Sequence, residues 1–165
     1  MRGRFLAALA ALFVALSGLA RAEDWTITPG VGVGPVKLGM RLSEVEKPLG
    51  LIRKDTWAPG GIIRYTKYGG VEIEWNPRAV QIVVPSAKVS VSGRPVGLVA
   101  EGGIRVGQST QAQMESVYGR NYQAQPLKTG RNEPLKTHYI YADKKIGFIV
   151  SNGKVISINI WSGGK

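Results

Sequence analysis

The chain has 165 residues, with 22 Lys and Arg against 11 Asp and Glu, one His and no Cys. This length suits one ordinary domain, and a hydrophobic share of 44% is typical of a globular protein rather than a disordered one. The absence of Cys excludes disulfides, thiolate metal ligands and a thiol nucleophile, and a single His excludes a multi-His metal site. We therefore expect neither a metal nor a cofactor.

The first 22 residues have the pattern of a secretory signal peptide. Arg2 and Arg4 precede an apolar run over 5–16, and residues 20–22 (Ala-Arg-Ala) place small side chains where a signal peptidase recognises them. The alternative is an uncleaved membrane anchor, but a helix needs about 20 apolar residues to span a bilayer. The pattern predicts cleavage after Ala22 and a mature protein that is periplasmic or secreted.

The charge of the mature chain suggests classes of partner. Cleavage removes three basic residues, which lowers the net charge from +11 to +8. The remaining excess favours anionic partners, such as phospholipid head groups, lipopolysaccharide or an acidic protein, and is compatible with peripheral contact with a membrane. The alternative is that the charge only keeps the protein in solution. Export itself argues against nucleic acid as the partner.

A glycine-rich segment follows at 30–34, with the sequence GVGVG. It resembles a phosphate-binding loop, but such a loop leads directly into the N-terminus of a helix. Here residues 35–38 predict a strand, and the next helix is expected only near Ser43. The segment is therefore predicted to be a flexible turn.

Two short helices are predicted from their capping residues. Ser43 with Glu46, and Thr110 with Gln113, fit the capping box, in which the two side chains satisfy each other's backbone donors. Pro48 and Gly50 are expected to stop the first helix, and Gly119 the second. Helices of about two turns are not stable alone, so both are expected to pack on a sheet.

Alternating apolar and β-branched residues predict eight strands. They span 62–67, 71–75, 79–84, 88–91, 96–99, 138–141, 146–150 and 155–161. Asn152 and Gly153 lie between the last two strands and predict a type I′ hairpin turn.

The two halves of the mature chain repeat the same order of elements. Residues 36–50 align with 104–119 on shared glycines, and 64–75 align with 138–150 on a shared tyrosine. Each half contains a short strand, a helix and then a run of strands. An internal duplication is the simplest explanation.

The duplication predicts the fold class. One mature domain, 23–165, is expected to consist of two repeats, about 23–91 and 92–165. The predicted fold is α+β, with two tandem helix-plus-antiparallel-strand repeats that share one antiparallel sheet and place their helices on one face.

A short motif in the first repeat carries a family resemblance. The motif is G-M-x-x-x-E-V-x-x-x-L-G, formed by Gly39, Met40, Glu44, Val45, Leu49 and Gly50. With the strands that follow, it resembles the repeat of the small lipoprotein subunit of the outer-membrane β-barrel assembly machinery (the SmpA/OmlA group). It is also similar to the tandem repeat of β-lactamase inhibitor protein. The chain lacks the lipidated Cys of the former and the disulfides of the latter. Both relatives are binding proteins, so the resemblance implies binding rather than catalysis.

Two carboxylates offer the main alternative. Glu72 and Glu74 alternate with Val71, Ile73 and Trp75, so both are expected on one face of a strand, with Cα atoms about 6.5–7 Å apart. A glycosidase pair can have such a spacing. The usual meaning of this alternation is a solvated face. A small periplasmic hydrolase that uses Glu72 and Glu74 is therefore the alternative function, and His138, alone in its strand, is expected to be structural.

Strand alternation predicts which side of the sheet meets solvent. In the last strand Ile156, Ile158 and Ile160 share one side, which we expect to be the core. The other side, which we expect to be open, then carries Val155, Ser157, Asn159 and Trp161.

Aromatic residues are expected to dominate that open side. If Ile140 is in the core, Tyr139 and Tyr141 join Trp161 on the open face, and the duplication adds Tyr65. Such aromatics commonly anchor protein interfaces. The sequence thus predicts a non-enzymatic binding or assembly protein of the bacterial cell envelope, which holds a protein or an anionic envelope component through these four residues. The alternative is that they only shield the sheet or lie beneath the 120–137 loop.

Overall fold

The computed structural model describes residues 24–49, 54–57, 64–68, 70–75, 79–92, 94–131 and 133–163, with backbone alone at 54–57, 64–68 and 80. The predicted signal peptide and its cleavage site lie outside these residues. Within the described ranges no helix combines the length and the hydrophobicity that crossing a bilayer requires.

The described chain is built mainly from strands. In order, they are β1 (Asp24–Thr28), β2 (Gly32–Val33), β3 (Val36–Lys37), β4 (Lys54–Trp57), β5 (Arg64–Tyr68), β6 (Val71–Trp75), β7 (Ala79–Val84), β8 (Lys88–Val91), β9 (Arg94–Ala100), β10 (Gln123–Leu127), β11 (Lys136–Tyr141), β12 (Ile146–Ser151) and β13 (Lys154–Trp161). The helices are α1 (Leu42–Leu49), α2 (Gln111–Tyr118) and the single 3-10 turn η1 (Glu101–Gly103).

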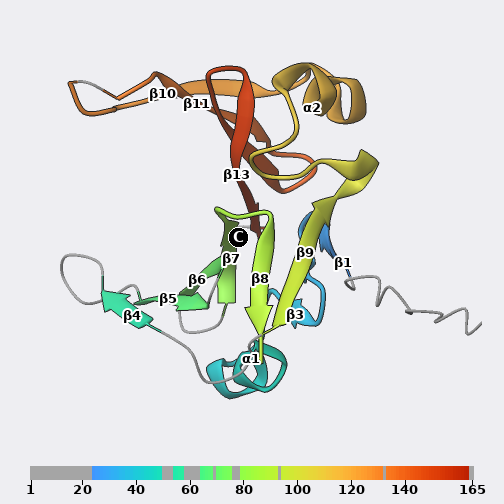
Figure 1. The fold of residues 1–165 in the computed structure, drawn as a ribbon, viewed down its shortest axis with the longest axis vertical. Helices are drawn as coiled ribbons and strands as arrows, with labels where there is room; N and C mark the ends of the chain where they lie inside the picture. Colours follow the sequence, from blue (N-terminus) through green and yellow to red (C-terminus); the bar gives the residue numbers. More distant parts are fainter. Residues whose placement is uncertain are drawn as a thin grey trace, which may run out of the picture.

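These strands form two sheets (Figure 1). The large sheet is antiparallel and has the order β10-β11-β12-β13-β7-β6-β5-β4, with β13 and β7 side by side at its centre. The small sheet has the order β3-β2-β1-β9-β8, and its β1 and β9 run parallel. The predicted fold class is therefore wrong. The protein is mostly β, with a curled eight-stranded sheet and a second sheet, and not two helix-plus-strand repeats around one antiparallel sheet.

The small sheet depends on pairing between distant parts of the chain. Asp24 in β1 lies opposite Gly97 in β9, and Arg105 Nη2 forms an ion pair with Asp24 Oδ2 at 2.6 Å. Alternation within a strand carries no information about which distant strand will pair with it. The prediction therefore missed this sheet and assigned β8 and β9 to the large one. The glycine-rich segment 30–34 contains β2 and leads into β3 rather than into a helix.

The two helix predictions had different outcomes. The capping box of Thr110 and Gln113 is confirmed at the start of α2, with both reciprocal hydrogen bonds present. In α1 the predicted pair is wrong, because the helix begins at Leu42 and Glu44 Oε2 accepts a hydrogen bond from the Arg41 amide at 2.6 Å. The predicted helix ends agree with the structure, because α1 ends at Leu49, directly after Pro48, and Gly119 is the C-cap of α2. Asn152 and Gly153 both have positive φ, as the predicted type I′ turn requires.

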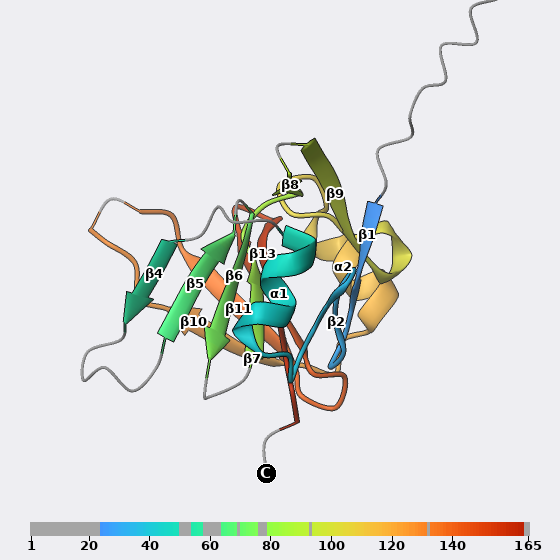
Figure 2. The same ribbon diagram turned by 90° about the horizontal axis from the view of Figure 1, so that it is seen from below.

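One hydrophobic core joins the two sheets and both helices. It includes residues of the large sheet (Ile73, Ile82, Phe148, Ile158, Ile160), of the small sheet (Ile27, Val33, Val89, Leu98) and of the helices (Val45, Leu49, Met114, Tyr118). In Figure 2, α1, α2, β1 and β9 gather on one side of the large sheet. The small sheet and the helices therefore cover the same face of the large sheet.

Candidate binding surface on the large sheet

The register of the large sheet separates its two faces. Ile82, Ile160, Ile146 and Tyr141 lie in one row across four strands, and each is fully buried. Successive side chains in a strand point to opposite faces. The residues that alternate with this row therefore belong to the other face of the sheet.

We call this other face the open face. Its described members include Glu72, Glu74, Gln81, Val83, Gln123, Lys136, His138, Ile140, Gly147, Ile149, Ser151, Ser157, Asn159 and Trp161. None of its four large apolar side chains (Val83, Ile140, Ile149 and Trp161) belongs to the hydrophobic core. All four are half-buried. The open face thus carries a second apolar group, separate from the core.

A polar network lies at the centre of the open face. Ser157 Oγ donates a hydrogen bond to Asn159 Oδ1 at 3.2 Å, and Asn159 Nδ2 lies 3.4 Å from His138 Nε2. The His138 ring lies directly over Gly147, where an added Cβ would collide with Nε2. Ser157 and Asn159 are only 6% exposed, although both helices and the small sheet pack on the opposite face. The surrounding side chains therefore shelter these polar groups.

Burial lowers the pKa of His138 below its usual value. In the folded protein a neutral Nε2 can accept the hydrogen of the Asn159 amide, whereas a protonated ring would face it as a second donor. The unfolded chain, with a pKa of about 6.5, then takes up the proton first as the pH falls. The contribution of neutral His138 to stability is complete above the pKa of the unfolded chain, and it is lost as the pH falls from there through the lower pKa of the folded protein.

This gives a pH-dependent prediction. Urea unfolding should show that the wild type loses stability relative to His138→Gln as the pH is lowered from about 7.5 to about 5.5. The comparison is clean because the chain has no other His. A stability difference between the two proteins that stays constant over this range would contradict the assignment.

Several predicted positions are confirmed. Val71, Ile73 and Trp75 are buried, while Glu72 and Glu74 lie on the opposite, open side of β6. Trp161 lies on the open face opposite Gln81 of β7. Tyr65 lies opposite Glu74 in the backbone register, and its side chain is outside the described part of the structure.

The open-face placement of Tyr139 and Tyr141 is wrong. Both share the core side of β11, because Tyr139 lies opposite Phe148 and Tyr141 opposite Ile146. Tyr141 is fully buried, and its hydroxyl donates a hydrogen bond to the Gly119 carbonyl at 2.8 Å. A buried tyrosine is stable when its hydroxyl has such a partner. Ile140, predicted to be in the core, lies on the open face instead.

The start of β13 also differs from the prediction. A β-bulge shifts the register at Ile149 and Val150, so that Val150 lies opposite Val155 and Ile149 opposite Ser157. Ile156 is the extra residue and is half-buried, while Val155 is fully buried. Ile158 and Ile160 are in the core, as predicted.

Sequence reasoning missed His138, Ile140 and Ile149 as members of this surface. The sequence did contain one signal for Ile140. His138 is two residues before Ile140, so both side chains point to the same face of the strand. A polar residue on the face that His138 and Ile140 share indicates that this face is the less buried side of β11. Ile149 could not be placed in the same way, because the bulge beside it breaks the alternation.

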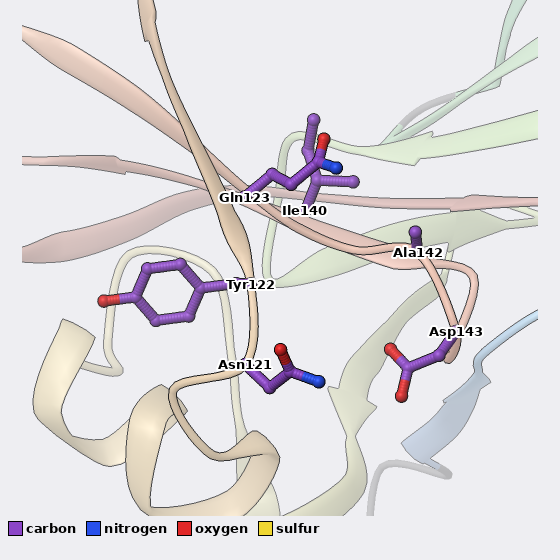
Figure 3. A pocket seen from close by; sticks show the side chains of 6 residues that line it. All are labelled: Asn121, Tyr122, Gln123, Ile140, Ala142 and Asp143. Carbon is purple, nitrogen blue, oxygen red and sulfur yellow. The ribbon is translucent and has the colours of Figure 1, made fainter.

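A small hollow lies at one end of the open face. It is lined by Asn121, Tyr122, Gln123, Ile140, Ala142 and Asp143 (Figure 3). Gln123 lies opposite Ile140, which lies opposite Gly147, so the hollow continues the row that crosses the open face at Asn159.

The described residues offer no group of three or more His, Asp or Glu side chains that could hold a metal ion. Comparison with protein-family models, with curated proteins and with solved structures finds no match to the chain. The geometry of the open face is therefore the basis for inferring function.

Proposed function

We propose that the protein is an exported, non-enzymatic binding protein of the bacterial cell envelope, which holds a protein partner through the open face. The observation that carries this proposal is the group of Val83, Ile140, Ile149 and Trp161, which lies outside the core and around the polar centre. Apolar and aromatic anchors beside hydrogen-bonding groups are typical of protein interfaces. The signal-peptide pattern supports cleavage after Ala22 and a place in the periplasm or outside the cell.

The alternative, a hydrolase that uses Glu72 and Glu74, has less support. In register they lie opposite Val83 and Gln81 of β7 and opposite Lys67 and Tyr65 of β5, so neither has a second carboxyl group opposite it. General acid–base chemistry on a sugar needs one carboxyl group held in its protonated form by its surroundings. Half-buried carboxylates beside an amide are better suited to hydrogen bonding with a partner.

The proposal can be tested by photo-crosslinking in intact cells. A photoreactive amino acid at Gln81, beside Trp161 on the open face, should yield an adduct with one partner protein. The same residue at Gln108, which is exposed in the loop before α2, should yield none. Truncating an aromatic anchor costs about 2 kcal/mol or more, so Trp161→Ala should weaken binding of that partner about 30-fold.

Two results would overturn the proposal. One is equal labelling from both positions, which would show contact without a preferred face. The other is normal capture by a Trp161→Ala variant that is as stable as the wild type in urea unfolding.

A further inference from the structure

The hollow at the end of the open face has the size of a single side chain. Its volume is about 230 Å³. Pockets that enclose whole small-molecule ligands usually measure roughly 300–1,000 Å³. An occupant that reaches in from a larger partner therefore fits the hollow better than a free ligand of ordinary size.

Three of its side chains can accept hydrogen bonds. Asn121 and Gln123 carry carboxamides, and Asp143 carries a carboxylate. In Figure 3 Asn121 and Asp143 face one another across the hollow, with the amide nitrogen of Asn121 turned toward the Asp143 carboxylate, and Gln123 lies beside Ile140. Asn121 and Gln123 are exposed, as is Asp143, and none of the three side chains has an ion pair or a side-chain hydrogen bond within the described residues.

The remaining wall residues bring no positive charge into the hollow. Tyr122 points away from it in Figure 3, and its hydroxyl donates to Glu115 Oε1 at 3.0 Å. Ile140 and Ala142 supply apolar surface. Lys145, two residues beyond Asp143, lies instead against Gly30 and Gly163. The hollow thus combines one negative charge, two carboxamides and an apolar wall.

We propose that this hollow binds an arginine side chain of the protein partner. A guanidinium group is planar, always charged and carries five donors, which suits acceptors distributed over three side chains. The methylene stem of the arginine would pack on Ile140 and Ala142. A lysine concentrates its donors on one nitrogen and matches this spread of acceptors less well.

The place of the hollow connects it to the open face. The row from Gln123 through Ile140 and Gly147 to Asn159 is continuous across four strands. A partner seated on the open face can therefore insert one side chain into the hollow. The origin of the arginine rests on the proposed function, whereas the recognition of a guanidinium group can be tested without the partner.

The test uses N-acetyl-arginine amide as the probe and the amide resonances of the ¹⁵N-labelled mature protein as the readout. We expect saturable shifts at Asn121, Gln123 and Asp143. N-acetyl-citrulline amide, which has the same shape but no charge, should bind much more weakly. Asp143→Asn should weaken binding of the arginine probe about two- to fivefold, the loss expected for an exposed ion pair.

A matched control separates a local effect from a change in net charge. Glu101→Gln removes one carboxylate from the exposed turn η1 and should leave the affinity for the probe unchanged. The inference is overturned if the probe shifts none of the three amides, or if Asp143→Asn binds it as the wild type does. It is also overturned if N-acetyl-citrulline amide or N-acetyl-lysine amide binds as tightly as N-acetyl-arginine amide. Crosslinking from Gln81 tests the proposed function separately, so the two failures can be distinguished.

Discussion

Replacing Tyr141 with alanine is expected to destabilise the protein by about 3–5 kcal/mol, the usual cost of removing a large aromatic side chain from a core. Tyr141 is fully buried, and its ring centroid lies 5.6 Å from that of Tyr118 and 6.0 Å from that of Phe148. The substitution would leave a cavity among these rings and remove the hydrogen bond to Gly119. Urea unfolding of the mature protein measures the loss.

Tyr141→Phe separates packing from hydrogen bonding. It keeps the ring and leaves the Gly119 carbonyl without its donor, so we expect a loss of about 1 kcal/mol. Burial raises the pKa of Tyr141 to about 12, so the hydroxyl stays a donor throughout the neutral range. If Tyr141→Ala kept the stability of the wild type and lost only partner binding, the original open-face assignment would be restored.

A fragment that ends at Pro85 is expected to be unfolded or aggregated. Without residues 86–165, β7 loses its central neighbour β13, and β1 loses its parallel partner β9. The apolar inner face of β6 and β7 then has too little covering structure, because a few strands without a complete hydrophobic core are marginal in water.

Circular dichroism and the dispersion of amide resonances distinguish a folded fragment from an unfolded one. The mature chain 23–165 is the control and should unfold in a single transition, because one core joins both sheets. A fragment 23–85 that unfolds cooperatively would show that the first half has a sufficient core of its own.

The local parts of the fold could be predicted from the sequence. The strands Val71–Trp75, Ala79–Val84 and Lys88–Val91 begin and end where alternation places them. Alternation also separates Glu72 and Glu74 from the core and places Trp161 on the open face. These successes share a cause. In a half-buried strand, consecutive residues alternate between the buried face and the solvent-facing one, so the local sequence shows both faces.

The failures have a different physical origin. In 138–141 both faces of the strand carry large apolar side chains. Whether Ile140 or the two tyrosines face the core depends on whether a buried tyrosine hydroxyl has a hydrogen-bond acceptor. That acceptor, Gly119, is 22 residues away in the chain. Pairing of β1 with β9 is equally non-local. The hollow beside the open face collects residues from the ends of different strands, so no single stretch of sequence indicates it.

The hydrogen bond between Tyr141 and Gly119 has a consequence for binding as well as for the core. Asn121 follows Gly119 by two residues, and Asp143 follows Tyr141 by two, so this one bond fixes the chain just before each of the two facing polar groups. The two sides of the hollow are thereby tied to one another in the protein without a partner, which would preorganise the proposed arginine site. Such preorganisation lowers the entropic cost of association, since less of the receptor has to be ordered when the ligand binds.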